Sequence, residues 1–295
     1  LVSSAQPLHP VELVQWARNK GAKFVWNQNG VAYPAWAGTD CERTNGPMRE
    51  LLGLADYAIY QSEFCRSSAD RFVGRTPAKS EILYNCVDTE VFSPRKEPLL
   101  GPPWIVLAAG SHQQAERVTS ALETVAVLRR AGQDVRLTLA GRLGWEGAEN
   151  DVDAAIDRLG LGGCVSRRGP YSQAEAPDLY RAAHVLIHTK YKDPCPTVVI
   201  EAMACGLPVI GSHSGGMPEL VGNEAGILIE VPDSWDRMHY PAVSELADAV
   251  ASILSNLAEW RDRGRERAVR LFDQELWVKR HGEIFSEVLN VSAEH

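Results

Sequence analysis

One carboxylate inside an apolar run, together with helix amides that lack partners, could give residues 192–220, KDPCPTVVIEAMACGLPVIGSHSGGMPEL, a binding function. Pro196 suits the first position of a helix, where its missing N–H costs nothing, and Gly206 is a typical helix terminator. The amides of Thr197 and Val198 then have no acceptor inside the helix. Together with the helix dipole they form an anion site suited to a phosphate.

Glu201 lies more than one turn inside this helix and is flanked by apolar residues. A buried carboxylate without partners costs on the order of several kcal/mol, so Glu201 needs hydrogen-bond donors. Two explanations are open at this point. Either the hydroxyls of a ligand donate to Glu201, or the carboxylate merely bonds a neighbouring loop of the protein.

The next strand and turn repeat this arrangement. A strand that ends at Gly211 leads into Gly215 and Gly216, which can adopt positive φ and allow close approach to the backbone. Pro218 and Glu219 then open a short helix. Two successive turns that aim amides at one crevice suit a diphosphate, although a glycine pair alone would more often be a plain turn.

Short apolar runs alternate with helical patterns along the chain. We expect strands at KFVWNQ, DYAIYQS, SEILYN, WIVLAAG, DVRLTLAG, CVSRRG, HVLIHT, LPVIGS and AGILIE. We expect helices near residues 49–55, 63–73, 115–131, 149–160, 173–183 and 196–205. This alternation predicts an α/β protein with parallel sheets covered on both faces, whose ligand crevice lies at the carboxyl ends of the strands.

A proline cluster divides the chain. Residues 93–103, SPRKEPLLGPP, contain four prolines and are predicted to be a linker. With 295 residues, 45% of them hydrophobic, the chain forms one large or two medium globular domains. A net charge of -8 lacks the basic footprint of a nucleic-acid-binding protein, so we expect no nucleic-acid partner.

The cellular setting is predicted from cysteine and hydropathy patterns. Six cysteines without a C-x-x-C pair indicate reduced thiols rather than a disulfide framework or a zinc site. His184 and His188 have metal-ligand spacing only in a helix, and their segment reads as a strand, so we expect no metal site. No apolar run could span a bilayer and no signal peptide opens the chain. We therefore expect a cytoplasmic protein, which leaves a peripheral membrane contact open.

The segment 193–221, DPCPTVVIEAMACGLPVIGSHSGGMPELV, resembles the donor-binding signature of the family 4 retaining glycosyltransferases. In that signature a carboxylate, seven residues and a second Glu precede A-M-A-x-G-x-P-V-I and a G-G-x-P-E turn. The similarity extends over nearly all of residues 55–290. It implies a GT-B fold, in which two Rossmann-like domains face each other across a cleft.

The resemblance implies the following domains. Residues 1–98 would form a partial, acceptor-side Rossmann-like domain, and residues 99–272 the domain that binds the nucleotide sugar. The helix at 273–295 would pack back on the N-terminal domain. We expect the N-terminal domain to be truncated, because a complete one has more strands and a glycine-rich loop, and because the chain opens with Leu1 rather than Met.

The resemblance also assigns roles to residues. Asp193 takes the first carboxylate position, beside the transferred sugar, and Glu201 the second, on the ribose hydroxyls. Arg117 stands within one residue of a family lysine on the diphosphate, so Asp193 and Arg117 are the expected catalytic residues. The other expected contacts to a UDP- or GDP-sugar are Thr197, Val198, Cys195, Gly110, Ser111, His112, Gly215, Gly216, Gly169, Tyr171 and Glu219. The family uses no metal and no cofactor, since amides and cationic side chains stabilise the departing diphosphate.

This sequence departs from the family's pattern in three places. Asp193 is one methylene shorter than the usual Glu, and Ser111 replaces an Arg that would meet the diphosphate. The family's catalytic-site His is missing from the N-terminal half. The corresponding stretch, VWNQNGVAYPAW, offers Asn27 and Asn29 instead. Its aromatic residues could stack on a sugar or simply pack the domain core: Trp26, Tyr33 and Trp36.

The leading prediction is a retaining glycosyltransferase with an unknown acceptor, which could be a glycan, a lipid-linked molecule or a small molecule. A GT-B epimerase would also bind a nucleotide sugar, but without an acceptor. A phosphorylase would need a lysine-bound pyridoxal site that the sequence does not show. From a different class, a non-catalytic nucleotide-sugar-binding or partner subunit is favoured by Ser111 and by the short N-terminal half.

Overall fold

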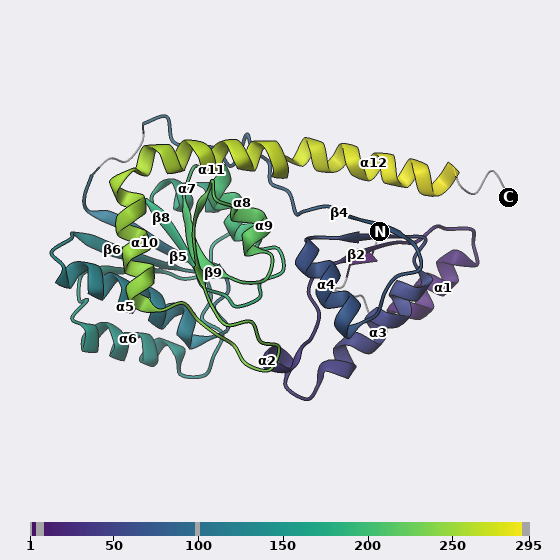
Figure 1. The fold of residues 1–295 in the computed structure, drawn as a ribbon, viewed down its shortest axis with the longest axis horizontal. Coiled ribbons are helices and arrows are strands. Elements are labelled where there is room, and N and C mark those ends of the chain that lie inside the picture. The colour runs from purple at the N-terminus through teal and green to yellow at the C-terminus, as the bar shows by residue number, and fades with distance from the viewer. Residues whose placement is uncertain (1, 4–8, 98–100, 291–295) are drawn as a thin grey trace.

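The computed structural model describes residues 2–3, 9–97 and 101–290, which form two separate parallel sheets (Figure 1). The first sheet has the strand order β1-β2-β3-β4, with β1 (Val2–Ser3), β2 (Val25–Gln28), β3 (Tyr57–Tyr60) and β4 (Lys79–Ile82). The second has the order β10-β9-β8-β5-β6-β7, with β5 (Trp104–Ala109), β6 (Val135–Ala140), β7 (Val165–Arg168), β8 (Val185–His188), β9 (Val209–His213) and β10 (Gly226–Glu230). Each expected strand is present. In most of them buried β-branched and aromatic residues favour the strand, whereas β4 and β7 are more exposed.

The second sheet has the strand order of a Rossmann fold. Counted outward from β5, the order reverses between β5 and β8, which is where such sheets bind ligands. Successive residues of β5 face opposite layers: Val106 packs in one core and Leu107 in the other. The first of these layers is built by α5 (Ala115–Arg130), α6 (Ala148–Leu159) and α10 (Val243–Ser255). The other is built by α7 (Ala176–Arg181), α8 (Thr197–Ala204), α9 (Met217–Val221) and α11 (Leu257–Phe272).

The N-terminal sheet is covered by α1 (Pro10–Arg18), α3 (Cys41–Leu54) and α4 (Glu63–Phe72), while the short α2 (Pro34–Ala37) lies beside the second half of the molecule. Helix α3 begins eight residues before the expected start, within the unfavourable stretch CERTNGP. The buried side chain of Asn45 explains this start. It accepts a hydrogen bond from the Ala32 amide at 2.9 Å and donates to the Ala32 carbonyl at 2.8 Å.

Helix α12 (Gln274–Asn290) leaves the second half and runs along the first sheet (Figure 1). Ile284 and Val288 pack against Val25 and Tyr57 on one face of that sheet. Arg280 adds a two-pronged ion pair, with Nε and Nη2 donating to the carboxylate of Glu81 at 2.8 and 2.6 Å. The C-terminal helix therefore ties the two halves together.

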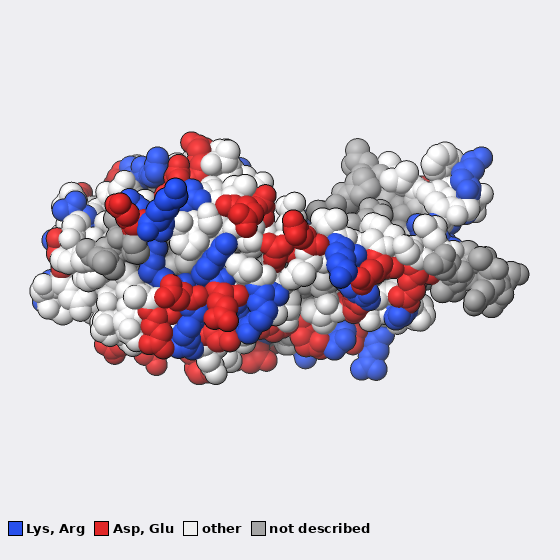
Figure 2. All heavy atoms as spheres, turned by 90° about the horizontal axis from the view of Figure 1, so that it is seen from above, with Lys and Arg blue, Asp and Glu red and all other residues white. Residues whose placement is uncertain are grey.

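The surface and the cysteines complete this description. Among residues 2–3, 9–97 and 101–290, no helix has the length and apolar character that a membrane crossing requires. Figure 2 shows acidic and basic side chains interspersed on the face crossed by α11 and α12, without a broad patch of one sign. All six cysteines are free thiols.

Candidate functional site

Two turns meet at the carboxyl end of the second sheet. The turn after β8 contains Lys192 and Asp193, and the turn after β9 contains Ser214 and Gly216. Ser214 Oγ accepts a hydrogen bond from the Lys192 amide at 3.0 Å, and the Gly216 amide donates to the Asp193 carbonyl at 2.8 Å. These turns are therefore in direct contact at one edge of the sheet.

This contact gives the two glycines a packing role. A Cβ atom on Gly215 would lie 2.5 Å from the Asp193 carbonyl oxygen, and one on Gly216 would lie 2.0 Å from that of Pro194. The glycines thus let the two turns pack together, and the Gly216 amide is already engaged by protein. The expected contacts of Gly215 and Gly216 to a donor stay predictions.

Asp193 is buried and held by two side chains. His188 Nε2 donates to Oδ2 at 2.9 Å, and Lys190 Nζ donates to Oδ1 at 3.1 Å. Burial alone raises the pKa of the Asp193 carboxyl, but the hydrogen bond from His188 and the charge of Lys190 outweigh it and hold that pKa below its usual range. Asp193 is therefore a fixed, ionised carboxylate at neutral pH.

Glu201 forms part of the wall of a cavity of about 350 Å³ at the end of β5. The Tyr180 hydroxyl donates to Glu201 Oε2 at 2.7 Å, so the carboxylate has a protein donor while it still faces the cavity. Burial raises the pKa of Glu201, and the Tyr180 hydrogen bond opposes that rise. We call this space the donor cavity, because several residues expected to contact a donor line it. Its wall consists of Gly110, Ser111, Gly141, Arg142, Pro170, Tyr171, Gln173, Ala176 and Glu201.

The start of α8 lies beside this cavity. Pro196 precedes the helix rather than occupying its first position, and its carbonyl accepts from the Val199 and Ile200 amides at 3.1 and 3.4 Å. The amides of Thr197 and Val198 come before these first bonds, as those of a helix N-terminus do. Val198 Cγ2 lies 3.4 Å from where a Cβ on Gly110 would be, which places the helix start next to the cavity wall.

Arg117, at the start of α5, is hydrogen-bonded to the loop that follows β5. Arg117 is buried, and its Nη1 donates to the Ser111 carbonyl at 2.8 Å, while its Nε has no hydrogen-bond partner within the described part of the chain. Burial lowers the pKa of Arg117, and the nearby Asp193 opposes that change. Arg117 is not part of the donor-cavity wall, whereas Ser111 is.

His112 has a protein partner. Its ring is buried, Nε2 donates to the Ala140 carbonyl at 3.1 Å, and burial lowers the pKa of the ring to about 4. A neutral ring with one N–H already engaged has only an acceptor nitrogen left. The expected contact of His112 to a diphosphate stays a prediction, and in this arrangement the Nε2–H is engaged by the Ala140 carbonyl.

Cys195 and Glu219 have protein environments as well. The Cys195 thiol is buried in the core, which raises its pKa, and its carbonyl accepts from Asn85 Nδ2 at 2.9 Å. The Glu219 carboxylate accepts from the amides of Glu63 and Phe64 at 2.6 and 2.8 Å, at the N-terminus of α4. Glu219 therefore links the two halves, and Cys195 packs in the core. Their expected contacts to a donor stay predictions.

The loop after β7 borders a second hollow. Gly169 is exposed, and its carbonyl accepts from the Gly141 amide at 2.7 Å. Tyr171 contributes to the donor cavity and to a neighbouring hollow of about 220 Å³ that also contains Arg168 and Glu175. The two spaces share Pro170 and Tyr171, so one elongated ligand can reach both.

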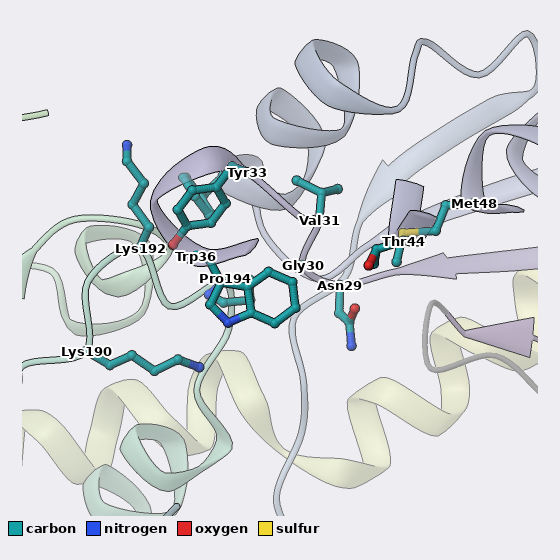
Figure 3. A pocket seen from close by; sticks show the side chains of 11 residues that line it. Asn29, Gly30, Val31, Tyr33, Trp36, Thr44, Met48, Lys190, Lys192 and Pro194 are labelled. Carbon is teal, nitrogen blue, oxygen red and sulfur yellow. The ribbon is translucent and has the colours of Figure 1, made fainter. Parts of the chain in front are cut away.

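A third space lies between the two halves of the molecule (Figure 3). This interdomain cavity of about 370 Å³ shares no lining residue with the donor cavity. Tyr33 and Trp36 face it from the N-terminal half, whereas Trp26 is fully buried and donates its Nε1–H to Gln28 Oε1 at 2.9 Å. The lining residues are Asn29, Gly30, Val31, Tyr33, Trp36, Thr44, Met48, Phe64, Lys190, Lys192 and Pro194.

Three cationic residues at these cavities were missed by the sequence interpretation. Lys190 and Lys192 line the interdomain cavity, and the exposed Arg142 lines the donor cavity. The sequence contains a signal for them, because each follows an expected strand at the edge of the sheet where the crevice was expected. Arg142 lies two residues after Ala140, the last residue of β6, and Lys190 and Lys192 lie three residues and one residue before Asp193.

Comparison with known sequences identifies a family. Residues 91–268, more than half of the chain, match the family described as "Glycosyl transferases group 1". A D-inositol 3-phosphate glycosyltransferase of Segniliparus rotundus is 27% identical over 225 residues, which cover 73% of this chain and 48% of that protein. An MMP alpha-(1->4)-mannosyltransferase of Mycolicibacterium hassiacum is 29% identical over 201 residues, or 67% and 46% of the two chains. The chain thus spans about half the length of these relatives.

Comparison with solved structures identifies the fold. A sucrose-phosphate synthase from Thermosynechococcus elongatus superposes with a TM-score of 0.76 at 22% identity, over 95% of this chain and 71% of the other. The Anabaena protein HepE in complex with UDP-glucose superposes with a TM-score of 0.73 at 18% identity, over 94% and 76%. The fold of the described residues is GT-B.

Proposed function

The chain belongs to the glycosyl transferases group 1, and on that premise we propose that it moves a sugar from a nucleotide-diphosphate sugar to an acceptor hydroxyl with retention at the anomeric carbon. Glu201 is the observation that carries this proposal: a buried carboxylate, one turn after the free amides of a helix start, in the wall of a cavity of about 350 Å³. That combination offers acceptors for ribose hydroxyls and donors for phosphates side by side.

The donor lies along the carboxyl edge of the second sheet in this proposal. The nucleobase occupies the hollow beside Tyr171, and the ribose hydroxyls donate to Glu201. The diphosphate meets the amides of Thr197 and Val198. The solved complex of HepE with UDP-glucose, which shares the fold, supports a UDP-sugar as the first donor to test.

The reaction breaks the bond between the anomeric carbon and the diphosphate oxygen and forms a bond to the acceptor oxygen. The helix amides, Arg142 at the cavity rim and the buried charge of Arg117 favour the negative charge that grows on the leaving diphosphate. Asp193 is fixed and ionised, so it can hydrogen-bond the sugar and favour positive charge at the anomeric carbon. The acceptor proton leaves with the diphosphate. No metal or cofactor enters this proposal.

A non-catalytic nucleotide-sugar-binding subunit is the second candidate. Ser111 stands at the position of an expected cation, and Arg117 is turned toward the Ser111 carbonyl instead of lining the donor cavity. A site with fewer cations on the diphosphate stabilises the leaving group less. Such a protein would bind the nucleotide and leave the sugar in place.

Calorimetry with UDP, GDP and UDP-sugars, followed by assays of donor hydrolysis and transfer, separates these candidates. We expect Glu201→Ala to abolish nucleotide affinity, and Asp193→Asn to keep affinity while transfer is lost. Glu230→Ala, at an exposed glutamate of β10, is the matched control and should bind as the parent does. Undiminished binding by Glu201→Ala would refute the ribose role, and binding without any turnover of the donor would establish the subunit.

A further inference from the structure

The interdomain cavity is placed to hold the second substrate. Lys190 and Pro194 line it, and Lys190 Nζ donates to Asp193 Oδ1 at 3.1 Å, so the cavity lies next to the carboxylate proposed to act on the sugar. The nucleotide is proposed to bind in the donor cavity, which has no lining residue in common with this one. A hydroxyl in the interdomain cavity can therefore approach the sugar without competing for the nucleotide site.

The wall of the interdomain cavity is mainly apolar. Tyr33, Trp36 and Phe64 contribute aromatic rings, and Val31 and Met48 contribute aliphatic surface. Trp36 is 54% exposed, which is unusual for so large a ring on a cavity wall. Figure 3 shows its indole between the Lys190 ammonium on one side and Asn29 and Thr44 on the other. A ring of the ligand can therefore stack on Trp36, with polar groups at either end.

The charges of this cavity are already balanced. No aspartate or glutamate lines it among the described residues, and the two lysines are paired: Lys190 with Asp193, and Lys192 with Asp233. The Lys192 ammonium also lies 3.9 Å from the centre of the Trp235 ring. A phosphate group would need to be buried here without an arginine or an unpaired lysine, and burial of an unpaired anion costs several kcal/mol.

On the basis of the proposed function, we infer that the acceptor is an uncharged, hydroxyl-bearing molecule with an aromatic or apolar face, held by stacking on Trp36, and not a phosphorylated sugar. Its hydroxyl oxygen forms the new bond to the anomeric carbon, its proton leaves with the nucleoside diphosphate, and no other reactant is consumed. Trp36 is the residue that determines this specificity, because it presents the largest exposed ring of the cavity wall.

Binding of three probes to the chain saturated with UDP tests the inference: 4-nitrophenyl β-D-glucopyranoside, D-glucose and D-glucose 6-phosphate. We expect the aryl glucoside to bind about tenfold more tightly than the other two, which is the gain that aromatic stacking supplies. Trp36→Ala should remove this difference. Trp16→Ala, at a tryptophan of α1 that is 62% exposed and outside the cavity, should preserve it.

The outcomes distinguish this inference from the proposed function. Tighter binding of glucose 6-phosphate, no binding of any probe, or an aryl preference that survives Trp36→Ala would each overturn the inference while UDP still binds. Failure of the parent chain to bind any nucleotide in the absence of probes would overturn the proposed function instead. Melting temperatures of both tryptophan variants show whether the fold is retained.

Discussion

His188 donates its Nε2–H to Oδ2 of Asp193 at 2.9 Å, and both side chains are buried at the carboxyl end of β8. Burial lowers the pKa of the His188 imidazole, so the ring is neutral and the hydrogen bond does not depend on its titration near neutral pH. With Lys190 on the other oxygen, the carboxylate is fixed from two sides. His188 therefore holds the Asp193 carboxylate in position.

Replacing His188 tests this positioning role. His188→Leu removes a donor to a buried carboxylate, so the pKa of Asp193 should rise and the acid limb of the kcat profile should move to higher pH. A hydrogen bond to a charged group contributes about 1.5–3 kcal/mol, so kcat should fall about 10- to 100-fold with little change in the KM for the donor. His188→Gln keeps an N–H at similar reach and should restore much of the rate.

Rates measured from acid to neutral pH for the parent and both variants provide the check. The same pKa sets the pH dependence of stability. Because the pKa of Asp193 is lower in the folded than in the unfolded chain, this carboxylate stabilises the fold above its unfolded pKa. That contribution disappears as the pH falls through the folded pKa. Equal losses in His188→Leu and His188→Gln, with an unmoved pH profile, would show that His188 only packs.

The close packing of the turns after β8 and β9 predicts that a methyl group added at Gly216 destabilises the protein. Gly216 has an ordinary φ of -82°, so an alanine there suffers no backbone strain, but its Cβ would lie 2.0 Å from the Pro194 carbonyl oxygen. Gly216→Ala should therefore push the turns apart, lower the free energy of unfolding by about 1–3 kcal/mol and reduce turnover. Gly162→Ala, where a Cβ meets nothing within 4 Å, is the control in thermal unfolding. Similar melting temperatures for both variants would contradict this account.

Much of the second sheet and of its site could be predicted from sequence, because the signals are local. Buried runs such as HVLIHT specify strands, Gly206 ends α8 with a φ of +69°, and Glu201 stands out as a charge in an apolar helix. The order of these elements then brings their ends to one edge of the sheet. Local pattern and topology were sufficient for this part.

The remaining features depend on partners far away in the chain. Tyr180, which donates to Glu201, lies 21 residues before it and carries no local mark of that role. Glu219 accepts hydrogen bonds from the amides of Glu63 and Phe64, which lie 156 and 155 residues earlier in the chain. The Gly-Gly-x-Pro-Glu turn that suggests a ligand contact for Glu219 is equally compatible with this capping of α4. The first turns of helix α3 likewise form against their own weak propensity, and Asn45 within them is bonded to the distant Ala32 backbone.

The hydrogen bond from Tyr180 to Glu201 predicts a specific loss of nucleotide affinity. Tyr180→Phe removes the donor that opposes the effect of burial, so the pKa of Glu201 should rise further and this carboxylate, proposed to bind the ribose, should become protonated at a higher pH. We expect UDP to bind about tenfold more weakly, with the largest difference at acidic pH. Tyr57→Phe, whose hydroxyl donates to Glu81 at 3.1 Å far from the donor cavity, is the matched control. Calorimetry at several pH values would refute the role of Tyr180 if both variants bound UDP equally well.

Trp235 connects the two halves of the molecule. It follows β10, yet its ring stacks on Phe64 at 5.7 Å and meets Tyr33 and Phe72 edge-on at 5.3 and 5.0 Å, all in the N-terminal half. Its carbonyl also accepts from the Ala35 amide at 2.7 Å, so the segment after β10 holds α2 and the wall of the interdomain cavity in place.

Trp235→Ala should therefore loosen the interdomain cavity and spare the donor cavity. Loss of a large ring in an aromatic cluster costs about 3–5 kcal/mol when it is fully buried, and less here because Trp235 is partly exposed. We expect faster hydrogen exchange in residues 231–242 and in α2, weaker binding of the aryl glucoside probe and unchanged binding of UDP. Trp260→Ala, whose ring packs within the second half, should lower stability without that selectivity. An equal loss of UDP and probe binding in Trp235→Ala would contradict the separation of the two sites, because both cavities would then depend on the same contact.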